Sequence, residues 1–157
     1  RRHPQRGHEP HPGPAVLRER MMNRTFKMML VLVDAGLLLY WGAVLLGLVP
    51  EEMRFKDYDD PVVEAWNWSF FPLDISAAVT VFLGAHLTRR GSRVGDLVLT
   101  VGLMLTFCAG FMAISFWSFY CDFDPLWWGP NVLLMLIPAL AFGSMVYGRL
   151  SGAESRP

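Results

Sequence analysis

The chain has 157 residues, of which 53% are hydrophobic and 18% are charged, and its formal net charge is zero. The charged residues lie in short clusters between long apolar runs, which is typical of a polytopic membrane protein with no nucleic-acid partner. Cys108 and Cys121 lie roughly 20 Å apart along one predicted helix, so a disulfide framework is excluded.

The N-terminal segment, residues 1–27, is predicted to be disordered. Its first twenty residues are mainly Arg, His, Pro and Gly, a composition that cannot build a core. Three histidines lie there, but a flexible tail offers a metal ion no fixed geometry, so we expect no metal site. Met21 and Met22 open a more conventional start, and we therefore expect residues 1–20 to be an upstream extension.

Four apolar runs follow, each long enough to cross a hydrocarbon core of roughly 30 Å as a helix. They cover residues 28–49, 70–87, 97–120 and 126–147. Pro130 and Pro138 interrupt the last run, which membrane helices tolerate when neighbouring groups take up the freed carbonyl. The predicted fold is therefore all-α, an antiparallel four-helix transmembrane bundle over residues 28–147, with a tail over residues 148–157.

A short interfacial helix is predicted over residues 61–70, ahead of the second run. Asp60 is suited to cap it, and Pro61 fits its first turn. Its apolar side chains share one face, as expected of a helix that lies along the membrane surface.

Lys and Arg residues gather in alternate connections. Twelve lie in the N-terminal segment, the 88–96 loop and the tail, whereas the 50–66 loop holds two, Arg54 and Lys56, and the 121–130 loop holds none. Because basic residues concentrate in cytoplasmic loops, we predict that both termini are cytoplasmic.

The predicted outer side is acidic and rich in tryptophan. Six carboxylates crowd the 50–66 loop and two lie in the 121–130 loop. Five of the six tryptophans fall at this interface, namely Trp66, Trp68, Trp117, Trp127 and Trp128. Aromatic belts usually occupy both membrane interfaces, whereas these tryptophans gather at one. We therefore expect any ligand to bind on this side.

Small residues recur at four-residue spacing in every predicted helix. The stripes are Ala43 and Gly47; Ser76, Thr80 and Gly84; Gly102, Thr106 and Gly110; and Ala139 and Gly143. Such stripes let membrane helices approach closely, which favours a compact bundle or a bundle that also dimerises.

Asp34 is a carboxylate about two turns inside the first predicted helix. A charge in hydrocarbon is costly and usually has a function, so one hypothesis is a site coupled to a proton or a cation. The alternative is structural and pairs Asp34 with His86 or Arg89 at similar depth on the second helix.

Asp74 has two interpretations as well. If Pro72 lies in the first turn of the second helix, Asp74 is placed to cap that helix. Alternatively it joins an outer pocket in which carboxylates beside indole faces would suit an organic cation. The candidate residues for ligand binding or for a structural polar role are Asp34, His86, Trp66, Asn67, Trp68, Asp74, Asp124, Trp127, Trp128 and Asn131.

The sequence contains no nucleophile motif, phosphate loop, metal-ligand pair or lipidation motif. We therefore expect a protein that is not an enzyme and uses no cofactor.

Three stretches carry a family resemblance. They are residues 48–61, residues 65–74 (Ala-Trp-Asn-Trp-Ser-Phe-Phe-Pro-Leu-Asp) and residues 123–131. In these stretches the chain resembles the YvaD family of small bacterial membrane proteins, which has four predicted spans and no established activity. The resemblance runs from about residue 27 to residue 147. It implies a bacterial plasma (inner) membrane location and transfers no catalytic residues.

Two function classes follow from these observations. The first is a non-enzymatic membrane protein that acts through a membrane-protein partner or as a homodimer, favoured by the small-residue stripes. The second is a small transporter of a cationic solute that uses Asp34 and the outer aromatic and acidic pocket.

Overall fold

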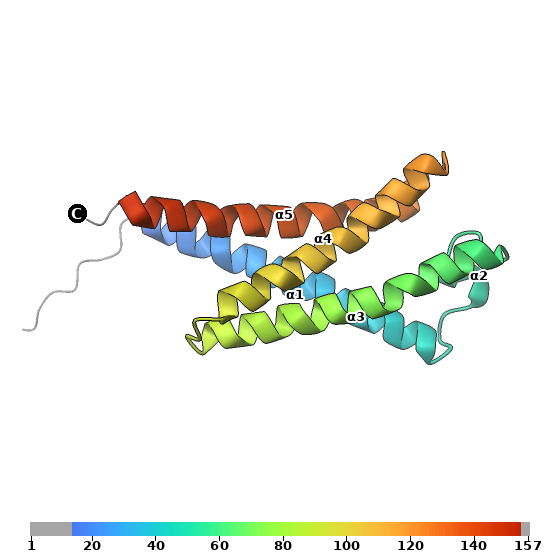
Figure 1. The fold of residues 1–157 in the computed structure, drawn as a ribbon, viewed down its shortest axis with the longest axis horizontal. Coiled ribbons are helices and arrows are strands. Elements are labelled where there is room, and N and C mark those ends of the chain that lie inside the picture. Colours follow the sequence, from blue (N-terminus) through green and yellow to red (C-terminus); the bar gives the residue numbers. More distant parts are fainter. Residues whose placement is uncertain (1–13, 155–157) are drawn as a thin grey trace, which may run out of the picture.

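The computed structural model describes the backbone of residues 14–154 and the side chains of residues 28–147 and of Leu150. Its elements in that range are the helices α1 (Pro14–Leu45), α2 (Glu51–Arg54), α3 (Pro61–Arg89), α4 (Gly95–Phe119) and α5 (Pro125–Glu154). All but the single turn α2 contain a stretch long and apolar enough to cross a membrane. The protein is thus a multi-pass membrane protein, and the predicted all-α, four-helix architecture is confirmed (Figure 1).

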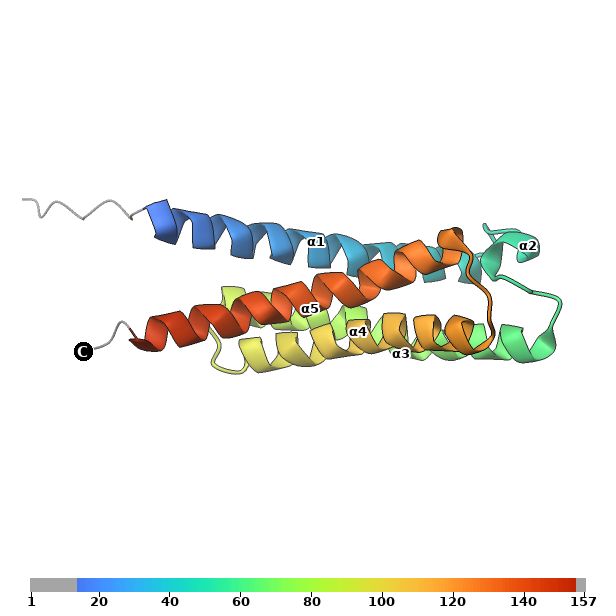
Figure 2. The ribbon, with the colours of Figure 1, turned by 90° about the horizontal axis from the view of Figure 1, so that it is seen from above.

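The four long helices form an antiparallel bundle in which each packs against two others. α3 packs against α1 and α4, and α5 packs against α4 and α1 (Figures 1 and 2). The connections 46–60 and 120–124 lie at one end, which we call the tryptophan-rich end. The connection 90–94 lies at the other, the basic end. The cytoplasmic placement of the basic end and of both termini remains a prediction.

The first helix differs from the prediction at both of its ends. It begins at Pro14, so residues 14–27, which we expected to be disordered, are helical. Proline suits a first helical turn, and the residues that follow include strong helix formers. The helix ends at Leu45, short of the predicted residue 49, because Gly47 has a φ of +68° and the Leu48 N–H donates to the carbonyl of Ala43 at 2.9 Å. The first thirteen residues lie outside the described part of the chain.

The predicted interfacial helix and the second membrane run are one continuous helix, α3. The cap predicted for its start is confirmed: Asp60 accepts from the N–H of Val62 at 2.8 Å, and Pro61 occupies the first turn. Pro72 lies inside this helix rather than at its start. The capping role predicted for Asp74 is therefore wrong, because that residue lies four turns beyond the actual cap.

The fourth membrane helix is also longer than predicted. α5 starts at Pro125 and continues through Pro130 and Pro138 as far as Glu154. Most of the segment predicted as a tail, residues 148–157, is thus helical up to residue 154.

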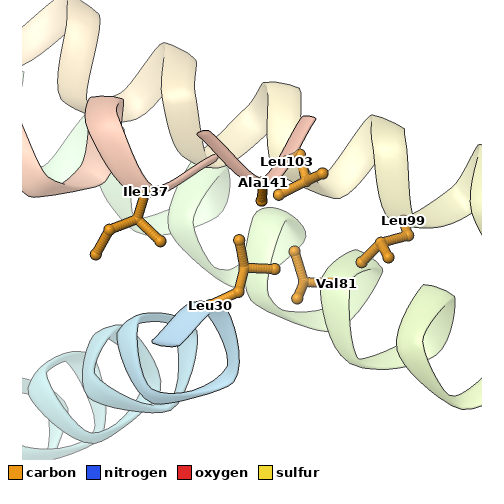
Figure 3. Close-up of a cluster of buried hydrophobic side chains, with 6 residues drawn as sticks. All are labelled: Leu30, Val81, Leu99, Leu103, Ile137 and Ala141. Carbon is orange, nitrogen blue, oxygen red and sulfur yellow. The ribbon is translucent and has the colours of Figure 1, made fainter. Parts of the chain in front are cut away.

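An apolar core fills the half of the bundle nearer the basic end. Figure 3 shows its side chains converging from all four long helices: Leu30, Val81, Leu99, Leu103, Ile137 and Ala141. A second cluster lies near the tryptophan-rich end. Its side chains on α1 and α3 are mainly aromatic, whereas those on α4 are the small side chains of Ala109 and Ala113. This difference in side-chain size leaves room between the helices at that end.

The predicted small-residue stripes are only partly where the helices meet. Gly102, Thr106 and Gly110 of α4 are buried, as a contact stripe requires. On α3 the predicted Gly84 is buried, but the predicted Ser76 is exposed and its neighbour Ala77 is buried instead. Ala139 and Gly143 of α5 are exposed. Close approach is therefore concentrated on α4.

Gly84 makes the tightest of these contacts, and its replacement should destabilise the bundle. A Cβ at this position would lie 2.4 Å from the backbone nitrogen of Leu99, which cannot move aside as a flexible side chain would. We expect Gly84→Ala to lower the free energy of unfolding by about 1–3 kcal/mol, measured by thermal unfolding in detergent. Gly143→Ala is the matched control, because a Cβ there meets nothing within 4 Å. Equal unfolding temperatures for the two variants would contradict this close contact between α3 and α4.

Candidate functional site

A cavity of about 560 Å³ lies between the long helices in the half nearer the tryptophan-rich end. Its size is within the range of small-molecule sites. Aromatic side chains from all four long helices and from the loop after α2 line it, namely Tyr40, Trp41, Phe55, Trp66, Phe70, Trp117 and Trp127. The outer ends of α3 and α5 both contribute to this cavity, through Trp66 and Trp127.

Asp74 is the one carboxylate among the side chains that line this cavity. It is buried in the middle of α3, and its Oδ2 accepts a hydrogen bond from Nε1 of Trp41 at 2.8 Å. Its other oxygen, Oδ1, is buried and has no hydrogen-bond partner among the described residues. The site therefore contains an acceptor that the described residues leave unsatisfied.

Four more of the predicted site residues line the cavity with Asp74: Trp66, Asn67, Trp127 and Asn131. The amide nitrogen of Asn67 donates to the carbonyl of Val63 at 2.9 Å, and that of Asn131 to the carbonyl of Trp127 at 2.7 Å. Each amide is thus fixed by its own helix. The indole of Trp66 is held by stacking on Phe116, with ring centroids 3.9 Å apart.

Three other predicted site residues lie outside the cavity lining. Trp68 packs behind Trp41, with ring centroids 5.5 Å apart. Asp124 accepts from the backbone N–H of Leu126 at 2.9 Å, which places it as a cap at the start of α5. Trp128 donates from Nε1 to the carbonyl of Asp122 at 3.0 Å. These three side chains support the walls of the cavity and the connection between α4 and α5.

Asp34 lies deeper in the bundle and does not line the cavity. Its side chain is fully buried, at 0% exposure, and its Oδ1 lies 3.2 Å from the hydroxyl oxygen of Thr106 on α4. The structural hypothesis that paired it with His86 or Arg89 is therefore wrong about the partner, since both of those residues are exposed near the end of α3. The small hydroxyl of Thr106 can approach Asp34 because it belongs to the buried stripe of α4.

Trp41 and Lys56 are the residues that sequence reasoning missed. Trp41 shares a helical face with Asp34, which is visible in the sequence, but its bond to Asp74 joins positions on different helices. The sequence indicates Lys56 only as one of two basic residues in an outer loop. In the structure its Nζ lies 2.5 Å from an oxygen of Asp122, 3.4 Å from one of Asp124, and 5.5 Å from the ring centre of Trp117.

Lys56 therefore fastens the loop after α2 to the connection between α4 and α5. Met53 and Phe55, which flank it in sequence, line the cavity, so this contact also holds part of the cavity wall. The hydrogen bond and charge of Asp122, with a smaller contribution from Asp124, raise the pKa of Lys56 above its ordinary value of 10.5.

Removing this contact should loosen the loop. In Lys56→Met, we expect amide hydrogen exchange over residues 50–60 to become several-fold faster, because the variant keeps the apolar stem but lacks the charge. Hydrogen-exchange mass spectrometry in detergent measures this effect. Asp59→Asn, which alters an exposed charge on the same loop, is the control and should leave the exchange unchanged.

The contact should also respond to alkaline pH in a defined direction. A lysine whose pKa is raised by folding contributes stability that is complete below its unfolded pKa and is lost as the pH rises through the higher folded value. Loop protection should therefore persist to about pH 10 and fall above it. Identical exchange in wild type and Lys56→Met, after correction for intrinsic rates, would show that the contact does not hold the loop.

Comparison with known proteins gives a family but no biochemical activity. A family of unknown function (DUF5360) matches residues 26–151 of the chain. One relative, described as the uncharacterized protein YvaD of Bacillus subtilis (strain 168), is 42% identical over 115 residues, which cover 73% of this chain and 86% of that protein. No solved structure matches the chain. The resemblance seen in the sequence is thus confirmed, and the chain belongs to this family of unknown function (DUF5360).

Proposed function

We propose that the protein binds a monovalent organic cation in the aromatic cavity, as the ligand site of a small, non-enzymatic transporter of the bacterial plasma membrane. The observation that carries this proposal is the unpartnered Oδ1 of Asp74 in the wall of that cavity. An ionised carboxylate inside a membrane helix is costly unless a counter-charge or a proton neutralises it. A bound cation would supply the counter-charge.

The aromatic lining supports a cation as well. Indole and phenol rings attract cations through the negative faces of their π systems, and the attraction strengthens where water is excluded. Trp66, Trp117, Trp127 and Tyr40 all line the cavity that contains Asp74. The combination of one carboxylate with several aromatic rings favours a charged nitrogen or phosphorus centre that carries apolar groups.

The rest of the lining favours an organic cation over a metal ion. Hard metal ions prefer several converging oxygen ligands. Most of the other lining residues are aliphatic or small, such as Val33, Leu37, Ala113 and Leu134. An apolar substituent would gain free energy by leaving water for such a surface.

The charge of the tryptophan-rich end would assist entry of a cation. Glu52 and Asp59 are exposed in the connection between α1 and α3. The two basic residues there are already paired, Arg54 with Glu51 and Lys56 with two carboxylates. A negative field at the mouth of a cavity raises the local concentration of cations.

Binding of tetraphenylphosphonium to the purified protein tests the proposal. We expect Asp74→Asn to weaken binding at least about tenfold, or ~1.4 kcal/mol, because the amide lacks the charge. Its oxygen can still accept from Trp41, so the bundle should remain folded. Isothermal titration calorimetry in detergent gives the affinity, with Glu64→Gln, an exposed position on the same helix and outside the cavity lining, as the control.

Neutral triphenylphosphine oxide separates charge recognition from simple hydrophobic binding. It should bind more weakly than tetraphenylphosphonium to wild type and equally to wild type and Asp74→Asn. If tetraphenylphosphonium binds both proteins with the same affinity, Asp74 is not the counter-charge and the proposal fails.

The other function class drawn from the sequence, action through a protein partner or as a homodimer, stays a prediction. Native mass spectrometry from a mild detergent would report it directly, as a dimer or a co-purifying protein.

A further inference from the structure

Asp34 is a second intramembrane carboxylate, and the organic-cation site does not use it. Along α1 it lies between the two core clusters. Leu30 of the apolar cluster is one turn before it, and Trp41 of the aromatic cluster is two turns after it. Its side chain is inaccessible to solvent, and its Oδ2 has no hydrogen-bond partner among the described residues. Neither core cluster provides a cation to neutralise it.

The groups presented by the neighbouring helices are nearly all neutral. α4 presents the hydroxyl of Thr106. From α3 the titratable group in the buried core is Asp74, which would carry a like charge. α5 has no titratable side chain between Pro125 and Val146. An ionised Asp34 would therefore face an apolar environment and a second carboxylate.

The hydrogen bonds around Thr106 indicate how this cost is avoided. Its Oγ1 lies 3.2 Å from Oδ1 of Asp34 and 3.2 Å from the carbonyl oxygen of Gly102, and both of these atoms are acceptors when Asp34 is ionised. A threonine hydroxyl has a single hydrogen and can donate to only one of them. If Asp34 carries a proton, the acid donates to Oγ1 and the hydroxyl donates to Gly102. Both distances are then hydrogen bonds.

We infer that Asp34 is a proton-binding site that is occupied in this conformation, and that it exchanges its proton for the cation bound beside Asp74. The second half of this inference rests on the proposed function, whereas the first half does not. With the cavity empty, the core holds a neutral Asp34 and an ionised Asp74. When a monovalent cation binds and Asp34 releases its proton, the core holds two carboxylates and one positive charge.

The net charge of the buried core is the same before and after this exchange, so neither state requires an additional uncompensated charge in the membrane. The coupling is reciprocal. Protonation of Asp34 lowers the affinity for the cation by the same factor by which bound cation lowers the affinity of Asp34 for its proton. The route of the coupling is short, because Trp41, which bonds Asp74, is two turns from Asp34 on the same face of α1.

Infrared spectroscopy of the ligand-free protein tests the first half. A protonated carboxylic acid in a membrane core gives a carbonyl stretch that a carboxylate does not give. At neutral pH we expect this band in wild type and in Asp74→Asn, and its loss in Asp34→Asn. The absence of the band in wild type, or its persistence in Asp34→Asn, would overturn the proton site.

A second variant protects the test against misfolding of Asp34→Asn. Thr106→Val removes the acceptor for the acid proton and should shift the carbonyl band to higher frequency while Asp34 itself is retained. Thr100→Val is the matched control, because the Thr100 hydroxyl donates to the carbonyl of Asp96 in its own helix. An unshifted band in Thr106→Val would contradict the proposed hydrogen bond.

Proton release tests the exchange. When tetraphenylphosphonium is added to wild type in a weakly buffered solution, we expect release of roughly one proton per bound cation, and binding without release in Asp34→Asn. Binding to wild type without proton release overturns the exchange. If the infrared band depends on Asp34 but tetraphenylphosphonium does not bind, the proton site is supported and the proposed cation site is the part that fails.

Discussion

The hydrogen bond from Trp41 to Asp74 joins α1 to α3 inside the membrane, and the architecture of the tryptophan-rich half depends on it. A buried carboxylate in hydrocarbon needs donors, and this indole N–H satisfies one of its two oxygens. The bond fixes the orientation of the Trp41 ring, on which Tyr40, Phe55 and Phe71 then pack. The free oxygen of Asp74 and the rings of Tyr40, Trp41 and Phe55 line the same cavity, whose wall is therefore both negative and aromatic.

The tight and the open parts of the bundle complement each other. Glycines let α3 and α4 approach so closely that a methyl group would not fit at Gly84 or Gly102. At the other end the helices are separated by large rings, and the loop held by Lys56 contributes to the wall there. Rigid packing on the basic side can thus support a cavity on the tryptophan-rich side, which is the arrangement expected of a site formed between helices. Asp34 lies where the two parts meet.

The sequence predicts the four membrane helices because each is a long apolar run, and it predicts Trp66, Asp74 and Trp127 as candidates because tryptophans and carboxylates gather at the predicted outer interface. It does not reveal that α3 continues through Pro72, since a proline can either start or interrupt a helix. Contacts between helices, such as the one between Asp34 and Thr106, depend on the rotation of each helix about its axis. Apolar periodicity is nearly absent in helices that face lipid, so the sequence gives little information on that rotation.

The most direct test of a cation site beside Asp74 is a crystal structure with tetraphenylarsonium, an analogue of tetraphenylphosphonium whose arsenic atom scatters anomalously. We expect an arsenic peak inside the cavity, between Trp66 and Trp127 and next to the free oxygen of Asp74. Arsenic found only on the lipid-facing surface or beside the exposed acidic loop, with the cavity empty, would contradict it.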